Sequence, residues 1–208
     1  SHLTFIIMLI NIQLWAQDSS FTFEGGTYVN ITSNASLQTE IGMTIECWVN
    51  PELDNYSDYA PIIHYLRLGG ATEESGFTLQ YFDGALRFMV SVGDGNYDIV
   101  GDGLALWPGT SLEQNAWTHV AGTYDVATGE AKIFKNGEEQ ATFNTEGGNV
   151  NWDFIETMDM KIGKSEMNPG GDDGFFYGGI DEVRLWNSAL DAIALQSVMC
   201  DSPSGADG

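Results

Sequence analysis

The chain has 208 residues, with 30 Asp and Glu residues against 7 Lys and Arg residues, which gives a formal net charge of −23. Hydrophobic residues make up 43% of it and aromatic residues 12%, enough to build the core of one domain and to argue against disorder. So few cations cannot neutralise a nucleic acid backbone or hold the chain on an anionic membrane surface, which excludes both as partners. The many carboxylates instead favour divalent cations.

The first 16 residues carry no charged side chain and contain an almost unbroken apolar stretch at residues 5–15. About eleven residues are too few to span a bilayer as a helix, which takes about twenty. A polar break at residues 17–20 follows, so residues 1–16 are typical of a secretory signal peptide cut near Ala16. A hydrophobic first strand is the alternative. We therefore expect a secreted or cell-surface domain over residues 17–200, with no membrane insertion of the mature chain, and a linker or tail over 201–208.

The two cysteines, Cys47 and Cys200, lie near opposite ends of this domain. Export would place them in an oxidising environment, where they can pair. Closing so long a loop would stabilise the fold by about 4–5 kcal/mol in the chain-entropy model. A buried thiol at Cys47 and an exposed one at Cys200 is the alternative. Because the chain has no CxxC motif and no Cys/His cluster, a zinc site is not expected.

From residue 21 onward, short runs of alternating apolar and polar residues predict half-buried β-strands. Asp83-Gly84 and Asn136-Gly137 are typical of tight hairpin turns between such strands. The strands we expect cover residues 21–23, 28–31, 44–50, 76–82, 85–92, 117–124, 131–135, 138–143, 158–163 and 178–186.

One stretch near the C-terminus has helical periodicity. Leu190, Ile193, Ala194 and Val198 fall on one helical face, and Ser188 is the expected N-cap. One short helix after many turn-linked strands predicts an all-β fold, a two-sheet antiparallel β-sandwich.

Five segments in chain order resemble the landmarks of the LamG-like (laminin G type) jelly-roll domains, within the concanavalin A-like lectin/glucanase superfamily. They are FEGGTYV at 23–29, TIECWVNP at 44–51, WTHVAGTYD at 117–125, KNG at 135–137 and FYGGIDEVRLWN at 176–187. The resemblance covers about residues 21–200 and implies a jelly roll whose opening and closing strands lie side by side. It says much less about function, because this fold hosts many roles.

Three large rings, Trp48, Trp117 and Trp186, fall in the expected strands of these segments. Rings of this size fill the space between two packed sheets. We expect all three to be core residues rather than sugar platforms.

The resemblance also implies a structural calcium ion, because members of the superfamily often hold one that ties the first strand to the last. The matching positions are Glu24, Gly25 and Asp181, with a third contribution from the loop at 69–75. Calcium takes six to eight oxygen ligands, which carboxylates, carbonyls and water supply. The family more often has Asp at the position of Glu24, and Asp181 alternatively caps a strand through backbone N–H groups.

Two other acidic clusters, at 94–102 and 172–174, do not follow the EF-hand spacing. We expect both to be solvated loops rather than metal sites.

Hydrolases of this fold need two carboxylates about 5–5.5 Å apart, which one strand supplies at positions two apart. The nearest string in this chain places Glu156 and Asp159 on opposite faces, with Lys161 where a second carboxylate is wanted. The mature chain has only two histidines, His64 and His119, and His119 alternates with apolar residues as a structural residue does. We therefore expect no enzyme and assign no catalytic residue.

Sugar recognition uses exposed aromatic rings beside polar side chains. Tyr97, Trp107 and Trp152 lie in turn-rich segments and are the candidate ligand-binding residues, with packing over the sandwich edge as the alternative for each. The sequence favours a non-catalytic, calcium-stabilised module that recognises glycan or an extracellular protein, within a longer adhesin-like or carbohydrate-active protein. A hydrolase with an unrecognised site and a purely structural spacer are the alternatives.

Overall fold

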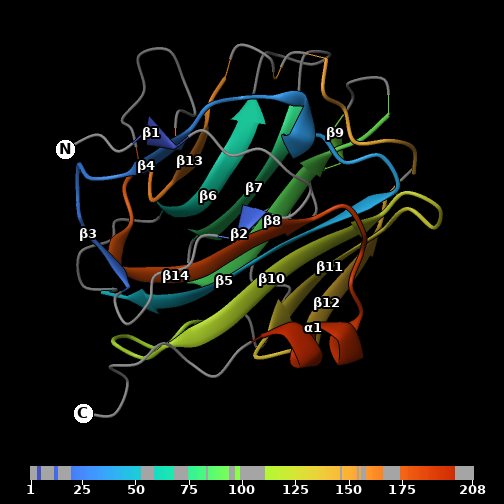
Figure 1. Ribbon diagram of the computed structural model, residues 1–208. Coiled ribbons are helices and arrows are strands. Elements are labelled where there is room, and N and C mark those ends of the chain that lie inside the picture. Colours follow the sequence, from blue (N-terminus) through green and yellow to red (C-terminus); the bar gives the residue numbers. More distant parts are fainter. Residues whose placement is uncertain are drawn as a thin grey trace.

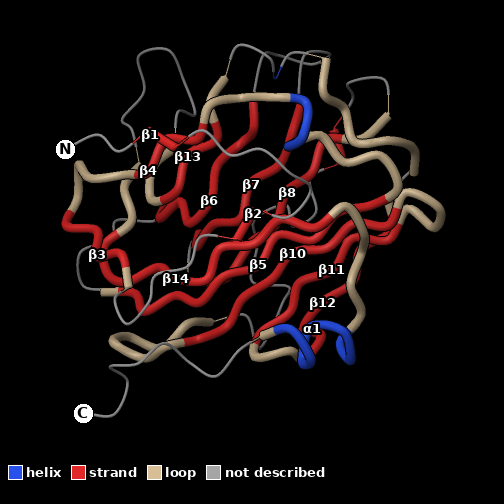
Figure 2. The backbone as a smooth tube through the Cα atoms, in the orientation of Figure 1, coloured by secondary structure: helices blue, strands red, loops and turns tan. Residues whose placement is uncertain are grey.

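The computed structural model describes residues 4–5, 12–13, 20–52, 59–67, 75–82, 84–93, 97–98, 111–145, 147–153, 155, 158–165 and 174–199. Its strands form two sheets that stack face to face, with one short helix against the outer side of the second sheet (Figures 1 and 2). The expected two-sheet β-sandwich is confirmed.

The first sheet has the strand order β1-β4-β13-β6-β7-β8-β9, and every pair in it is antiparallel except β1 with β4. Its strands are β1 (Thr4–Phe5), β4 (Val29–Ile31), β13 (Met160–Ile162), β6 (Tyr59–Arg67), β7 (Ser75–Phe82), β8 (Ala85–Ser91) and β9 (Tyr97–Asp98).

The second sheet has the order β12-β11-β10-β5-β14-β2, and β3 also pairs with β14. Its strands are β12 (Glu138–Asn144), β11 (Glu130–Lys135), β10 (Thr118–Asp125), β5 (Gly42–Pro51), β14 (Tyr177–Trp186), β2 (Ile12–Gln13) and β3 (Phe21–Glu24). Because β3 lies beside β14, the expected meeting of the opening and closing strands is confirmed.

The two-residue strands β1 and β2 lie inside the segment that we expect to be a signal peptide. They add short pairings to β4 in the first sheet and to β14 in the second. The signal peptide at 1–16 stays a prediction, and the tail at 201–208 lies outside the described residues. Within the part of the chain that the structure describes, no helix is long and apolar enough to cross a membrane.

The expectation that Trp48, Trp117 and Trp186 fill the space between the sheets is wrong. Cys47 and Val49 belong to the core, so Trp48 between them points to the outer side of the second sheet, where its ring meets that of His119 at 5.5 Å. The same alternation turns the other two rings outward. The fully buried aromatic residues of the core are Tyr65, Phe77, Phe88, Tyr124 and Phe176.

The helix α1 (Ala192–Val198) begins later than the periodicity predicted. Its N-cap is Asp191, whose carboxylate accepts a hydrogen bond from the N–H of Ala194, and not Ser188. This start turns Leu195 toward the second sheet and leaves Ile193 78% exposed, so the predicted apolar face is wrong at Ile193, whereas Leu190 packs as predicted. The sheet chooses the buried face, because Leu195 packs in a small cluster with Ala121, Phe134, Leu190 and Ala192.

Cys47 is a free thiol buried in the core, so the structure does not contain the disulfide that we considered. Its neighbour Glu46 points to the opposite side of β5, toward Arg184, and Arg184 also donates to the carbonyl of Val198 near the end of α1. The described chain thus ends on the outer side of the sheet, whereas the thiol lies on the inner side. Cys200 lies outside the described residues.

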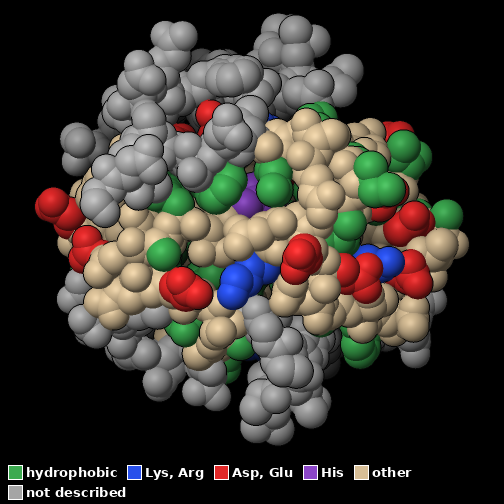
Figure 3. Space-filling view, turned by 90° about the horizontal axis from the view of Figure 1, so that it is seen from below, with side chains coloured by type: hydrophobic (Ala, Val, Ile, Leu, Met, Phe, Trp, Pro, Cys, Tyr) green, Lys and Arg blue, Asp and Glu red, His purple; other side chains and the backbone are tan. Residues whose placement is uncertain are grey.

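The underside of the molecule carries acidic and basic side chains with hydrophobic ones scattered between them (Figure 3). Among the described residues, the large hydrophobic side chains that are exposed are Ile41, Phe143 and Ile193. Singly exposed apolar side chains of this kind are normal on a soluble domain and do not mark an interface.

The contact between the two sheets is tight at Gly122 in β10. A Cβ at this position would lie 2.3 Å from the ring of Phe88 in β8. We expect Gly122→Ala to lower the free energy of unfolding by about 1–3 kcal/mol, the usual cost of overpacking, as measured by chemical denaturation. Combining it with Phe88→Leu should cost less than the sum of the single changes, because the smaller side chain makes room. Fully additive losses would contradict this contact.

Candidate functional site

The two carboxylates predicted to bind calcium lie on neighbouring strands of the second sheet. Glu24 is opposite Tyr177 in the β3–β14 ladder, whereas Asp181 is opposite Trp48 in the β5–β14 ladder. Four residues of β14 therefore separate the two positions, or about 13 Å along the strand. Calcium binding at these positions stays a prediction, and the carboxylates do not stand side by side.

Packing accounts for the glycine at position 25. Its φ of 69° lies in the left-handed region, and a Cβ there would lie 2.4 Å from the hydroxyl of Tyr177. Gly25 therefore has a structural role beside β14 whether or not its carbonyl meets an ion.

Asp181 is only 4% exposed, and its Oδ1 accepts a hydrogen bond from the N–H of Glu182 at 2.8 Å. Burial raises the pKa of this carboxyl group above its usual value. A second buried oxygen lies on the same face of the adjacent strand: Oδ1 of Asn50, which has no hydrogen-bond partner, stands opposite Gly179, two residues from Asp181.

Diagonal neighbours of this kind have Cα atoms about 7–8 Å apart, so both oxygens can meet one cation. In the described part of the chain, this region included, no group of three or more His, Cys, Asp or Glu side chains is arranged to hold a metal. Asp181 and Asn50 therefore fit a hard cation better than Asp181 and Glu24 do.

The two histidines lie on different sheets and do not form a common site. His119, in β10, is fully buried, with its Nε2 3.0 Å from Oε2 of Glu46, as expected of a structural histidine. His64, in β6, is also fully buried and stands opposite Lys161 and Thr78 in the ladders of the first sheet.

The carboxylate of Asp159, one of the two considered for glycoside hydrolysis, has a structural role. Asp159 accepts hydrogen bonds from Nδ2 of Asn30 at 2.6 Å and from the N–H of Ser33 at 3.2 Å, so both its oxygens are occupied. Glu156 lies outside the described residues.

Of the three candidate ligand-binding aromatics, Trp152 lines a pocket. Trp107, the side chain of Tyr97 in β9 and most of the acidic clusters at 94–102 and 172–174 lie outside the described residues. The pocket has a volume of about 680 Å³, within the range of about 300–1,000 Å³ that is typical of small-ligand sites.

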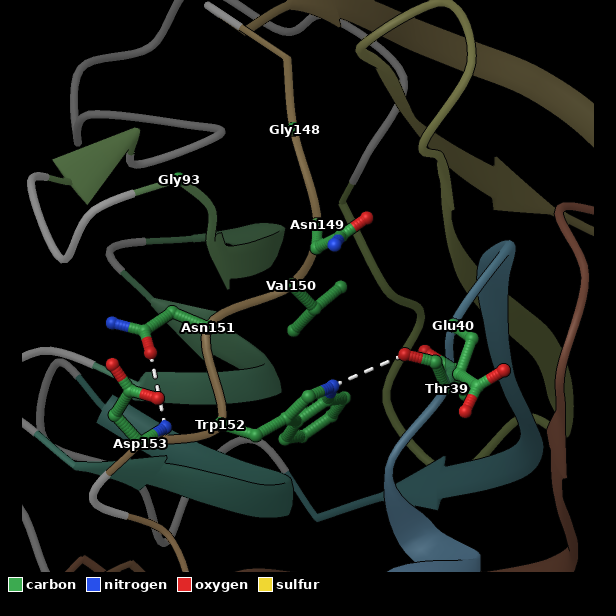
Figure 4. Close-up of a pocket in the computed structure, with 9 residues that line it drawn as sticks. All are labelled: Thr39, Glu40, Gly93, Gly148, Asn149, Val150, Asn151, Trp152 and Asp153. Carbon is green, nitrogen blue, oxygen red and sulfur yellow. Dashed lines mark hydrogen bonds between the residues drawn. The ribbon is translucent and has the colours of Figure 1, made fainter.

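This pocket, which we call the rim groove, lies at one end of the sandwich where the two sheets meet (Figure 4). Its lining residues are Thr39, Glu40, Gly93, Gly148, Asn149, Val150, Asn151, Trp152 and Asp153. The segment 148–153 is tied to the first sheet, because the N–H of Gly93 donates to the carbonyl of Asn149 and the N–H of Asn151 donates to that of Ser91. Thr39 and Glu40 lead into β5 of the second sheet.

Three contacts fix the indole of Trp152. Its Nε1 donates a hydrogen bond to the carbonyl of Thr39 at 3.1 Å, and its ring meets the rings of Tyr65 and Phe77 at 6.1 and 6.3 Å between centroids. The side chain stays half-buried and contributes to the wall of the rim groove. Trp152 therefore packs over the sandwich edge, as one of the two alternatives has it, and its contact with a ligand stays a prediction.

Polar groups surround this ring. Thr39 is 5% exposed, and its Oγ1 has no hydrogen-bond partner. Glu40 lies on one side of the segment 148–153 with Val150 and Trp152 turned toward it, and Asp153 points to the other side (Figure 4). The lining thus combines the aromatic side chain of Trp152 with the carboxylates of Glu40 and Asp153, which lie on opposite sides of the segment. Aromatic rings beside polar side chains are typical of sugar-binding sites.

Of the residues that line the rim groove, the sequence singled out Trp152 but not Thr39 or Glu40. These two residues lie in the chain before β5, more than a hundred positions from Trp152. Nothing in the local pattern around residue 39 indicates a site, because only folding brings it to the indole.

A family model described as the concanavalin A-like lectin/glucanases superfamily matches residues 23–195. This match lies inside the domain boundaries of 17–200 that we expect from the sequence. No curated protein matches the chain.

Several solved structures share the fold. The CBM40 of the Ruminococcus gnavus IT-sialidase, solved with alpha2,3 sialyllactose, has a TM-score of 0.63 and 17% identity over 91% of this chain and 98% of its own. A Bacteroides ovatus protein to which carbohydrate binding has been ascribed has a TM-score of 0.55 and 23% identity, over 86% of this chain and 44% of its own. The botulinum neurotoxin serotype G binding domain has a TM-score of 0.60 and 13% identity, over 90% of this chain and 44% of its own.

At these identities the similarities show the fold alone. The chain spans less than half the length of the last two proteins. These neighbours are described as binding proteins or binding domains, whereas the superfamily also includes hydrolases.

The buried imidazole of His64 makes the stability depend on pH. Burial and the nearby charge of Lys161 lower the pKa of His64 from 6.5 to about 4 in the folded state. As the pH falls, the unfolded chain therefore binds the proton before the folded chain does. The free energy of unfolding that His64 contributes is fully present above pH 6.5, and about 3 kcal/mol of it is lost between about pH 6.5 and 4. Chemical denaturation of the wild type and of His64→Gln as a function of pH isolates the contribution of His64. Identical pH profiles for the two proteins would contradict it.

Proposed function

We propose that this chain, which belongs to the concanavalin A-like lectin/glucanases superfamily, is a non-catalytic module that binds glycan in the rim groove. The observation that carries the proposal is the indole of Trp152, fixed by three contacts at the wall of a pocket of about 680 Å³ and surrounded by polar groups. We place the module outside the cell, secreted or at the cell surface, as part of a longer adhesin-like or carbohydrate-active protein.

The chemistry of the groove supports this proposal. A sugar ring presents C–H groups on its faces and hydroxyl groups around its edge, so it needs an apolar surface with donors and acceptors beside it. Trp152 supplies the surface, and the exposed side chains of Glu40, Asn149 and Asp153 supply polar groups. Because the indole is already held in place, little side-chain entropy is lost when a ligand binds.

The comparisons add support at the level of the fold. The Ruminococcus gnavus CBM40 is a sugar-bound domain of nearly the same extent as this chain, and the Bacteroides ovatus protein is described in terms of carbohydrate binding. The neurotoxin neighbours are binding domains. A shared fold supports a role in ligand binding but does not identify the ligand.

The proposal is tested by glycan-array screening followed by calorimetry on the best glycan. We expect Asn149→Ala and Asp153→Ala to weaken binding about five- to tenfold each, because each removes a polar contact worth about 1 kcal/mol. Both side chains are exposed, so the melting temperature should stay within the range of an ordinary surface change.

Trp152→Phe is the companion variant, since a phenyl ring can keep the contacts to Tyr65 and Phe77 but loses the hydrogen bond to Thr39. Trp117→Phe is its matched control, because Trp117 is a half-buried Trp that lies against Gly179, outside the groove. We expect weaker glycan binding in the first variant only. A protein that binds no glycan is a spacer or a binder of protein. Equal glycan binding by all these variants would place the site outside the rim groove, and turnover of a glycan would identify a hydrolase.

We propose in addition that Asp181 and Asn50 help to hold a structural Ca²⁺ ion. The support is the orphaned buried Oδ1 of Asn50 beside a buried carboxylate, together with the preference of calcium for oxygen ligands. A bound ion would connect β5 with β14 at the end of the sheet where β3 joins.

Calcium should then raise the melting temperature, because an ion that binds only the folded state stabilises it, by about 2.7 kcal/mol at a hundred times its Kd. We expect millimolar Ca²⁺ to stabilise the wild type relative to excess EDTA, and Asp181→Asn to remove the difference. Glu24→Gln is the matched control and should keep it. A melting temperature that does not respond to chelation rules out the ion.

A further inference from the structure

The charges of the rim groove restrict the kind of sugar that it can take. All seven Lys and Arg residues of the chain lie among the described residues, and none of them lines the groove. The lining does contain the carboxylates of Glu40 and Asp153. Residues outside the description can add negative charge to its surroundings but no lysine or arginine.

Most of these cations are held by other groups. Lys132 pairs with Glu130 and Glu139, and Arg184 with Glu46 and Glu182. Arg87 lies 4.9 Å from the centre of the Phe82 ring, Lys164 lies 4.9 Å from that of Tyr28, and Nζ of Lys135 donates to the carbonyl of Ser111. Lys161 stands opposite His64 in the first sheet.

Arg67 is the cation whose strand leads toward the groove. It is opposite Ser75 in the β6–β7 ladder, and the N–H of the next residue, Gly76, donates to the carbonyl of Asn151. Arg67 is nonetheless outside the lining. Replacing Arg67 therefore tests whether a cation from a strand that leads toward the groove contributes to the recognition of an acidic ligand.

We infer that the rim groove selects uncharged sugars and rejects sugars that carry a carboxylate, an inference that rests on the proposed function. A hydroxyl group donates well to Glu40 and Asp153, because hydrogen bonds to a carboxylate are among the stronger ones. A ligand carboxylate would meet the like charge of Glu40 on the side of Trp152, or that of Asp153 on the other side of the segment, in a chain of net charge −23 with no lining cation to compensate. Sialyllactose, the sugar with which the Ruminococcus gnavus CBM40 was solved, carries a carboxylate and would be among the rejected ligands.

The test compares glycans that differ only in charge, lactose with 3′-sialyllactose and a neutral galactan with polygalacturonate, on the folded full chain. We expect the glycans that bind to be neutral, and their acidic counterparts to bind at least about tenfold more weakly at low salt. The difference should shrink at high salt, which screens the exposed carboxylates.

Two double variants then test whether the discrimination between neutral and acidic glycans comes from the groove. Glu40→Gln with Asp153→Asn should reduce the discrimination to about threefold or less, because both like charges are gone. Glu113→Gln with Glu138→Gln removes the same charge and should leave the discrimination unchanged, since both side chains are exposed and neither residue lines the groove.

The failures can be told apart. Acidic glycans that bind more tightly than neutral ones, and lose affinity in Arg67→Gln and Trp152→Phe, would overturn the inference while leaving glycan binding in the groove intact. An equal loss of discrimination in the two double variants would also overturn it, because the effect would then come from net charge. Binding of no glycan at all would overturn the proposed function.

Discussion

Glu46 has no exposed surface, and its carboxylate is paired with groups from the strands on both sides of β5. Nε2 of His119 lies 3.0 Å from it, Nε1 of Trp186 lies 2.9 Å from it, and Nη1 of Arg184 lies 3.5 Å from it. A buried carboxylate is tolerated only when its oxygens are paired, and removal of one partner leaves a costly charge behind. The network therefore holds β10, β5 and β14 in one register, because a slip of one residue would turn every side chain of a strand to the other face.

That register decides what each face of the second sheet presents. Apolar residues such as Val49 and Ile180 face the first sheet, while Trp48 and Asp181 face outward. The outward side of the second sheet is thereby occupied by a buried polar layer and by the helix α1, whereas the rim groove lies at the end of the sandwich. This division is the usual one, in which regular strands supply a rigid scaffold and the segments that join them carry the site.

The rim groove shows how the scaffold and the site are connected. Its segment 148–153 is hydrogen-bonded to the first sheet at Ser91 and Gly93, whereas Thr39 precedes β5 of the second sheet. The indole of Trp152 joins the two, since it packs on core rings of the first sheet and donates to the carbonyl of Thr39. A ligand in the groove would therefore rest on a surface whose shape is set by both sheets, which suits binding without rearrangement.

The amino-acid sequence by itself determined the class of fold. Period-two alternation and turn residues predict most of the strands, and Asn136-Gly137 adopts the two positive φ angles, 52° and 73°, that its tight hairpin requires. The strand β6 escaped prediction because its residues are buried on both faces and Pro61 interrupts the run, whereas the sheet accommodates the proline next to a register shift.

Only the tertiary structure decided which face of a strand or helix is buried and which distant residues meet. Alternation divides residues into two sets without saying which set faces the core, so the outward position of Trp48 and the burial of Leu195 depended on the partner surface. The same holds for the rim groove. Thr39 and Trp152 are far apart in the sequence, and they are in contact because two sheets, each built from strands far apart in sequence, pack against one another.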